Sequence, residues 1–265
     1  MTVTASATAS RHGLPGQLLI EEVVRRQDRQ EPRTLADRLL GRSPISAKDL
    51  PWYVGAKGEL VVGRLLDRLS GEWRVLHSIP VGHAADIDHV VIGPSGVFVL
   101  NTKHHAGKRV WAAGRGVLVN GQRLPYVVKA EREAMRVTDA LARAGVLGTA
   151  VQPLIVLVGV ASLSLRASTE VPIVRAERLL PWLRSQPARL EEEVVAELAL
   201  RLRRPGIWAD GTEPVPDARA RFAAIDAEVA RAAAVRRMWA LGGAAASLGA
   251  VYSLMTAALT VLGGR

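Results

Sequence analysis

The sequence predicts a mixed α/β sheet flanked by helices, followed by a C-terminal transmembrane helix. Three observations predict the sheet: a stripe of leucine and valine at helical spacing over 55–69, two short apolar runs joined by a Pro/Gly turn within 85–105, and a continuous apolar run over 153–160. A helix, antiparallel strands and a strand that is apolar on both faces are typical of a sheet covered by helices. The 27 uncharged residues 238–264 predict the membrane span.

The composition limits the chemistry that the chain can carry. Of its 265 residues 49% are hydrophobic but only 4% are aromatic, so Val, Leu, Ile and Ala must form the core. The chain has no cysteine, which excludes disulfides and thiolate metal sites but leaves oxygen ligands for hard cations. Its formal net charge of +10 favours an anionic partner, either nucleic acid or an anionic membrane surface.

Residues 1–50 are predicted to be an N-terminal extension with disordered and helical parts. Residues 1–12 are small and polar without periodicity, so we expect a disordered leader. Residues 18–40 mix apolar pairs with a charged run, which predicts one or two exposed helices.

The main domain is predicted to span residues 51–205. Its first helix, over 55–69, carries Glu59 one residue before the apolar stripe. On pattern alone, a single glutamate at the start of a helix is usually a favourable partner of the helix dipole. Residues 72–79 then alternate apolar and polar side chains, which predicts a strand.

A β-hairpin is predicted at the centre of this domain. The apolar runs 89–92 and 97–100 are joined by Gly-Pro-Ser-Gly at 93–96. Short β-branched and aromatic runs on either side of such a turn are typical of paired antiparallel strands. The far ends of the two strands must therefore meet.

The hairpin brings four polar side chains together at one end of the sheet. Asp86 and Asp88 precede the first strand run, and Asn101 and Lys103 follow the second. Each pair is two residues apart and shares a face. Carboxylate and amide oxygens beside a lysine can hold Mg²⁺ and support phosphodiester hydrolysis. A strand-edge ion pair explains the same spacing equally well.

Further elements complete the predicted domain. Residues 109–119 predict a second hairpin, and residues 125–144 predict a helix. The run 153–160 predicts a central strand covered on both faces, 171–174 a shorter strand of the same kind, and 190–203 another helix.

The residues of this block resemble a known family. The motif Gly55-x-x-Gly-Glu59, followed by Asp86-Ile-Asp88-His-Val-Val-Ile-Gly-Pro-x-Gly-Val-Phe-Val-Leu-Asn101-Thr-Lys103, resembles the nuclease-related domain (NERD) family of the PD-(D/E)XK endonuclease-like superfamily. The resemblance covers roughly residues 52–160. It implies a restriction-endonuclease-like αβββαβ core and, in active relatives, Mg²⁺-dependent cleavage of nucleic acid.

The resemblance also implies roles for individual residues. Glu59 matches the helix acid, Asp88 the principal metal-binding acid and Lys103 the superfamily lysine, while Asp86 is the extra acid of the DxDH variant. We therefore expect Glu59, Asp88 and Lys103 to be catalytic, and Asp88, Asn101 and Asp86 to bind Mg²⁺ or Mn²⁺.

Asn101 departs from the superfamily pattern, which has Glu or Asp at this position. Its carbonyl oxygen can ligate a hard cation but adds no negative charge, so weaker metal binding is expected. His83, His89, His104 and His105 lie nearby in the sequence and could supply a substitute ligand or base. Surface or hydrogen-bonding roles are the more common use of such histidines.

The C-terminal part is predicted to be a membrane anchor. Residues 206–237 predict a linker and an alanine- and arginine-rich helix, and a helix over 238–264 would be roughly 40 Å long, enough to cross a bilayer. The arginines that precede it predict that the main domain lies at the cytoplasmic face of the cell membrane. The alternative is a buried helical hairpin, because seven alanines and five glycines in 238–264 make its hydropathy modest.

Small residues in this tail recur every four positions, at Gly242, Ala246 and Ala250. Such spacing permits close helix pairing within a membrane, so a homo-oligomer formed through the tail is a further expectation.

The combined prediction is a membrane-tethered, nuclease-like hydrolase that cleaves DNA or RNA with Mg²⁺. The alternative is a catalytically inactive nucleic-acid-binding or scaffolding module that retains the nuclease fold, which Asn101 favours. A third possibility is that the arginine-rich segments bind anionic lipid and not nucleic acid.

Overall fold

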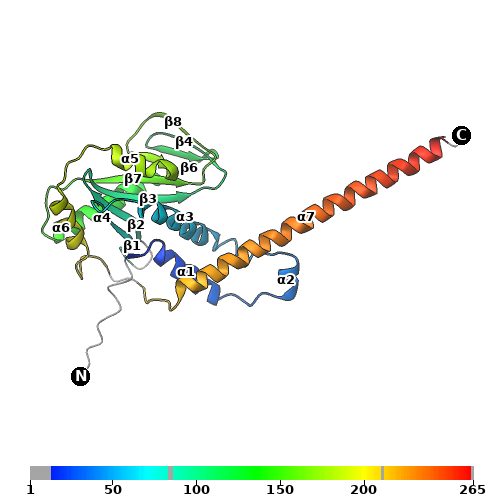
Figure 1. Cartoon of the computed structure of the whole chain (residues 1–265), viewed down its shortest axis with the longest axis horizontal. Helices are drawn as coiled ribbons and strands as arrows, with labels where there is room; N and C mark the ends of the chain where they lie inside the picture. Colours follow the sequence, from blue (N-terminus) through cyan, green and yellow to red (C-terminus); the bar gives the residue numbers. More distant parts are fainter. Residues whose placement is uncertain (1–12, 83–85, 210–211, 264–265) are drawn as a thin grey trace, which may run out of the picture. The chain divides into compact units, whose positions relative to one another are not determined.

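The computed structural model describes residues 13–82, 86–209 and 212–263 (Figure 1). The predicted disordered leader at 1–12, and His83, lie outside these residues. The chain divides into two compact units, of which the first contains Met1–Glu22 and Pro51–Val215 and the second contains Val23–Leu50 and Pro216–Arg265.

The first unit is built on a mixed five-stranded sheet with the strand order β1-β2-β3-β7-β9. The strands β1, β2 and β3 are antiparallel neighbours, and β7 and β9 continue the sheet in parallel with β3. Their bounds are β1 (Arg74–Pro80), β2 (Asp86–Gly93), β3 (Gly96–His104), β7 (Val151–Val158) and β9 (Ile173–Arg175). The predicted central hairpin and the buried strand that follows it are confirmed.

Helices cover both faces of this sheet, as predicted. On one face Val90 and Ile92 of β2 pack in a cluster with Val137 of α4 (Tyr126–Arg143) and with α6 (Glu192–Leu202). On the other face Val91 and Phe98 pack in a cluster with α3 (Leu50–Leu66) and α5 (Leu179–Ser185). Because alternate residues of a strand point to opposite faces, the near-continuous apolar run of β2 supplies both clusters.

A second, four-stranded sheet has the order β6-β5-β4-β8. The strands β4 (Arg109–Gly114), β5 (Gly116–Val119) and β6 (Gln122–Leu124) are antiparallel, which confirms the second predicted hairpin. The strand β8 (Ser162–Thr169), which the sequence did not predict, pairs in parallel with β4. One face of this sheet packs against β7 and α4 in a third core cluster, which includes Val110 and Ala112.

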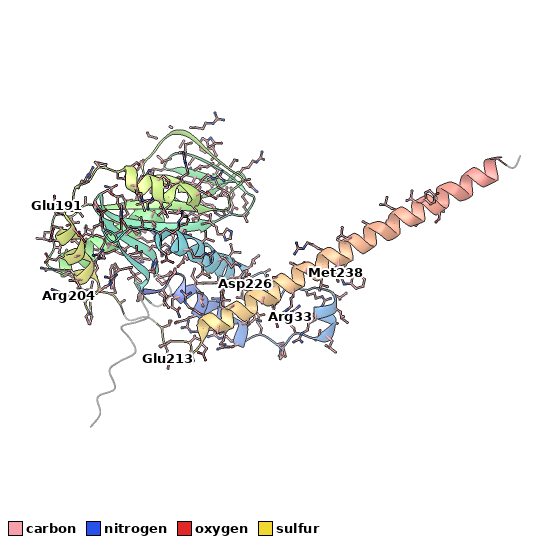
Figure 2. All side chains as sticks on the ribbon, viewed as in Figure 1. Arg33, Glu191, Arg204, Glu213, Asp226 and Met238 are labelled. Carbon is pink, nitrogen blue, oxygen red and sulfur yellow. The ribbon has the colours of Figure 1, made fainter. Side chains whose placement is uncertain are left out.

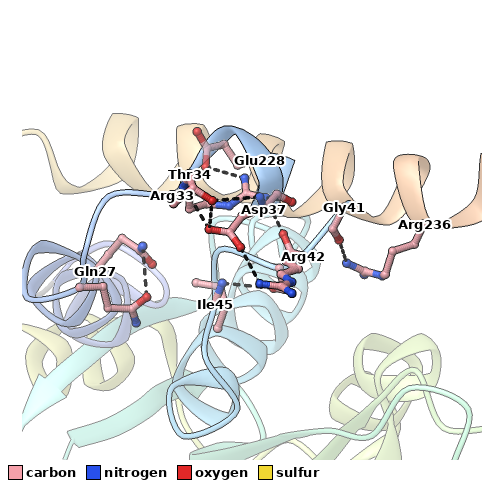
Figure 3. A network of polar contacts seen from close by, with 11 residues as sticks. Gln27, Arg33, Thr34, Asp37, Gly41, Arg42, Ile45, Glu228 and Arg236 are labelled. Carbon is pink, nitrogen blue, oxygen red and sulfur yellow. Dashed lines mark hydrogen bonds and ion pairs between the residues drawn. The ribbon is translucent and has the colours of Figure 1, made fainter. Parts of the chain in front are cut away.

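The second unit joins the chain segment around α2 (Leu35–Leu39) to α7 (Ala218–Gly263), and α1 (Gln17–Asp28) enters it by its C-terminal half. Polar contacts hold these segments together (Figure 3). Arg33 forms an ion pair with Glu228 at 3.3 Å, and Arg236 donates to the carbonyl oxygen of Gly41. Thr34 and Asp37 form a capping box at the start of α2.

The predicted C-terminal transmembrane helix is wrong. The helix α7 is a single element of 46 residues, and Met238 lies within it rather than at the start of a new helix (Figure 2). In the part of the chain that the structure describes, no helix is both long and apolar enough to cross a membrane.

Composition is the physical reason for this error. A stretch free of charge is not thereby strongly apolar, and residues 238–264 are rich in alanine and glycine, which contribute less to membrane insertion than leucine, isoleucine, phenylalanine or valine. The helical-hairpin alternative fails as well, because α7 is continuous. The predicted membrane anchoring and the pairing of tails rested on this span and are not supported.

Candidate active site

The first unit brings the predicted site residues to one end of its five-stranded sheet. Asp86 and Asp88 lie at the start of β2, while Asn101 and Lys103 lie near the end of β3. Glu59 lies in the middle of α3, because this helix begins at Leu50, five residues before the predicted start. Glu59 is therefore not a partner of a helix dipole.

A glycine allows α3 to approach the sheet at this point. A Cβ atom added to Gly58 would stand 3.0 Å from the Cβ of His104 and 3.3 Å from the Cγ2 of Thr102. The absence of a side chain at Gly58 thus lets the helix pack directly on β3. As a result the side chain of Glu59 is 2% exposed.

Asp88 is held by the backbone of β3. The pairing of β2 with β3 ends at His89 and Leu100, and beyond it the carboxylate Oδ2 of Asp88 accepts the backbone N–H of Thr102 at 2.6 Å. The side chain thus takes the place of the next ladder hydrogen bond. This bond fixes the carboxylate where the two strands separate.

Asn101 is fully buried and contacts an acid that the sequence analysis missed. Its Nδ2 donates to Oε2 of Glu133 on α4 at 2.6 Å, and Glu133 is only 3% exposed. Glu133 lies three residues after Ala130 and four before Val137, both of which are buried on the same helix. An acid within an apolar stripe is the sequence signal by which it could have been found.

Four buried oxygen atoms in this group have no hydrogen-bond partner in the structure. Buried polar atoms are almost always paired, so these oxygens are available to a bound species. Oxygen ligands of this kind suit a hard divalent cation in their chemistry. The four atoms are Oε2 of Glu59, Oδ2 of Asp86, Oδ1 of Asn101 and Oε1 of Glu133.

The described residues nevertheless contain no group of three or more His, Asp or Glu side chains arranged to hold a metal ion. The site also holds the amide oxygen of Asn101. A cation at this site would therefore have to use the amide oxygen together with the carboxylates.

Burial sets the protonation of the acids. Desolvation, with the charge of Asp88 next in importance, raises the pKa of Glu59 well above its usual range. The same two causes raise the pKa of Asp86 to about 7 and that of Glu133 to about 7. Carboxyl groups buried close together cannot all be ionised without a compensating cation.

Lys103 is the basic residue that lies among these acids. Its Nζ donates to the carbonyl oxygen of Thr102 at 3.0 Å and lies 5.4 Å from the ring centroid of Tyr126. Burial lowers its pKa, while the charges of Asp88, Glu133 and Glu59 oppose that effect.

The described histidines are engaged in hydrogen bonds, as their more common use predicts. Nδ1 of His104 lies 3.2 Å from the carbonyl oxygen of Val54, and Nε2 of His105 lies 2.6 Å from the hydroxyl of Tyr126. His89 pairs with His77 through their Nδ1 atoms at 2.7 Å. The contacts of these histidines give no support to a role as metal ligands.

A mixed sheet flanked by helices, with acids on two helices, two acids on one strand and a lysine on the adjacent strand, is consistent with the PD-(D/E)XK-like nuclease superfamily. Residues 54–158 match the family model of the nuclease-related domain. The resemblance stated from the sequence is thus confirmed, and this part of the chain is a NERD domain.

The chain is also similar to an uncharacterized protein of Bacillus anthracis, with 36% identity over 74 residues. The match covers 26% of this chain and 35% of the relative, so the chain spans about a third of the relative's length. No solved structure matches the chain at a significant level.

Proposed function

We propose that the NERD domain hydrolyses phosphodiester bonds of DNA or RNA with the help of a divalent cation. The observation that carries this proposal is the group of buried, unpartnered oxygens beside Lys103 at the end of β3. The formal net charge of +10 supports a polyanionic substrate, because neutralisation of phosphates supplies most of the non-specific affinity for nucleic acid.

The cation would be Mg²⁺ or Mn²⁺, held by oxygens of Glu59, Asp86, Asp88 and Asn101. When bound, such a cation polarises the phosphodiester and lowers the pKa of a water molecule. Lys103 offers a positive charge to the phosphate in a site from which water is largely excluded, where such a charge stabilises the transition state strongly.

Glu133 has two tasks in this proposal. Its hydrogen bond fixes the amide of Asn101, so that the oxygen of Asn101 remains free for the cation. Its carboxyl group, with a pKa raised to about 7, can also exchange a proton near neutral pH, which suits a general acid or base.

The test compares the full chain with its Asp88→Asn variant on single- and double-stranded DNA and on RNA, with Mg²⁺ or Mn²⁺. The amide of the variant keeps an oxygen that accepts the Thr102 N–H but loses the charge. We expect the wild type to cleave and the variant to lose roughly two orders of magnitude in rate, as is typical when a transition-state contact is removed. Asp139→Asn, at an exposed position of α4, is the matched control. Equal rates in Asp88→Asn and the wild type would contradict the proposal.

The second candidate is a binding module that has kept the nuclease fold without its chemistry. The presence of Asn101 where the superfamily has an acid favours it. This hypothesis predicts that the chain binds nucleic acid in a salt-dependent manner without a metal ion, and that Asp88→Asn binds equally well. It predicts no cleavage under any of these conditions.

A further inference from the structure

The second sheet carries an exposed aromatic side chain on its outer face. Trp111 of β4 is 39% exposed, whereas the residues on either side of it, Val110 and Ala112, are 2% and 0% exposed within the third core cluster. Because side chains alternate along a strand, the indole points away from that cluster.

The strand register places other outward-facing residues in one row with Trp111. Trp111 pairs with Leu118 of β5 and with Ser164 of β8, and Leu118 pairs with Arg123 of β6. Paired residues of adjacent strands lie on the same face, so the row runs across all four strands.

The sheet leaves room beside the indole. A Cβ atom added to Gly116 would stand 3.9 Å from Cζ3 of Trp111, so the missing side chain at Gly116 keeps the neighbouring surface low. An aromatic side chain next to a glycine on an open sheet is accessible to a flat ligand.

The charge on this sheet is uniformly positive. The strands β4, β5, β6 and β8 contain no Asp or Glu, while their arginines Arg109, Arg123 and Arg166 are all exposed. Two acids close to the sheet, Glu131 and Glu170, both form ion pairs with Arg115. The charge therefore complements a polyanion.

The same sheet is directly connected to the candidate active site. Residues 105–108 join β3, which carries Lys103, to β4. Tyr126, two residues after the end of β6, lies against Lys103 and bonds to His105. A ligand on this sheet could thus continue toward the buried carboxylates.

We propose that this surface, made of Arg109, Trp111, Leu118, Arg123 and Ser164 and called here the Trp111 face, binds single-stranded nucleic acid. The indole stacks on an unpaired base while the arginines neutralise adjacent phosphates, the combination by which proteins hold single strands. In a duplex the bases are stacked on one another and present no free ring to a flat sheet. The inference rests on the proposed nucleic-acid substrate and adds that the strand is unpaired at the Trp111 face.

The test measures binding of the full chain, in EDTA so that no metal-dependent cleavage occurs, to a labelled oligothymidylate of about 12 nucleotides and to a duplex of the same length. Trp111→Leu keeps an apolar side chain but cannot stack, and Trp111→Phe keeps a ring. We expect Trp111→Leu to weaken single-strand binding roughly 5- to 100-fold, Trp111→Phe to weaken it much less, and both to leave duplex binding unchanged.

A charge variant tests the second half of the inference. Arg123→Gln should reduce the slope of log affinity against log salt by about 0.7, the value for one phosphate contact of a single strand. Arg189→Gln removes the same charge from an exposed arginine whose backbone N–H bonds to Pro94, at the turn between β2 and β3, and should leave the slope unchanged.

The inference is overturned if Trp111→Leu binds the single strand as tightly as Trp111→Phe, or if both variants weaken duplex binding equally. It is also overturned if Arg123→Gln and Arg189→Gln give the same slope. Absence of cleavage in the metal assay would remove the proposed hydrolysis but would leave these binding results standing, so the two failures are distinguishable.

Discussion

At the scale of single residues, Asn101 lies at the position where the superfamily pattern has an acid on β3, and it contacts the buried acid Glu133 on α4. A hydrogen bond of 2.6 Å joins Nδ2 of Asn101 to Oε2 of Glu133, and each residue keeps one buried oxygen without a partner. The carboxyl group that is missing at position 101 is thus present on the adjacent helix α4, where a bound cation would favour its ionised form. The departure of Asn101 from the pattern does not leave the site short of an acid.

Loss of the carboxyl group of Glu133 should weaken metal binding. We expect Glu133→Gln to lower the affinity for Mn²⁺ by about 10- to 100-fold in calorimetric titration, the range found when the partner of a metal ligand is lost. The glutamine can still accept the Asn101 amide proton, so the variant tests charge rather than folding. Asp139→Asn, an exposed substitution on the same helix, should bind Mn²⁺ as the wild type does. Unchanged affinity in Glu133→Gln would show that α4 contributes nothing to the site.

That most residues of the candidate site lie together could be predicted, because four of them are close in the sequence. A hairpin with a defined turn brings Asp86 and Asp88 to Asn101 and Lys103, and the family resemblance adds Glu59. Glu133 could not be found in this way, since it reaches Asn101 only when α4 packs on the sheet. The burial of Asn101 could not be predicted either, because it depends on the packing of the same helix.

At the scale of elements, the β2–β3 hairpin depends on a glycine for space. A Cβ atom added to Gly93, the last residue of β2, would stand 2.1 Å from Cε3 of Trp73. The indole of Trp73 therefore packs directly on the backbone of Gly93 and closes the cluster between the sheet and α3. The sequence identified this glycine only as part of a turn.

Gly93→Ala should therefore destabilise the first unit. Overpacking of a core typically costs about 1–3 kcal/mol, and here the obstacle is an aromatic ring that cannot move without displacing its neighbours. Gly71→Ala is the control, because a Cβ atom at Gly71 would meet nothing within 4 Å. Urea unfolding followed by tryptophan fluorescence should give a lower midpoint for Gly93→Ala only. Equal midpoints would mean that Trp73 can repack without cost.

Elements with a clear apolar pattern were predicted, including β7, although it pairs with the distant strand β3. An element without such a pattern was not. Helices are present within 18–40 as α1 and α2, but α1 is not the exposed helix that was expected, because its side chains Ile20, Val23 and Val24 are buried. The helix expected over 125–144 is α4. The strand β8 was not predicted, because most of its residues are exposed and few are strongly apolar. Its pairing with β4, more than 40 positions earlier in the chain, is what forms it.

At the scale of the whole molecule, the long helix α7 could not be predicted from the distribution of charged residues alone. The absence of charged residues over 238–264 predicted a membrane span, but insertion depends on how apolar the side chains are, and alanine and glycine are weak in this respect. Contacts such as the ion pair between Arg33 and Glu228 tie the start of α7 to a segment nearly 200 residues earlier. Such long-range partners could not be read from local sequence patterns.

The buried acids should also make the stability of the whole chain depend on pH in a direction opposite to that of a carboxylate whose pKa is lowered by an ion pair. Asp86 and Glu133 have pKa values raised to about 7, against reference values of 3.8 and 4.5. Between the reference and the raised pKa, the folded state binds more protons than the unfolded state. The free energy of unfolding therefore falls as the pH rises through this window, by about 1.4 kcal/mol for each pKa unit that is realised.

We expect the metal-free chain to be less stable at pH 8 than at pH 5, and Mn²⁺ to restore stability at pH 8, because a cation that binds only the folded state stabilises it. Because the chain forms two units, hydrogen exchange of the β2 and β3 amides, corrected for the intrinsic effect of pH, is the suitable measurement. Asp86→Asn should reduce the pH dependence, because an amide does not titrate, and Glu133 should account for the part that remains. Equal protection of the β2 and β3 amides at pH 5 and pH 8 without metal would contradict this prediction. It would mean that the carboxyl groups are ionised in the folded protein at both pH values, because water reaches them and cancels the effect of burial on their pKa.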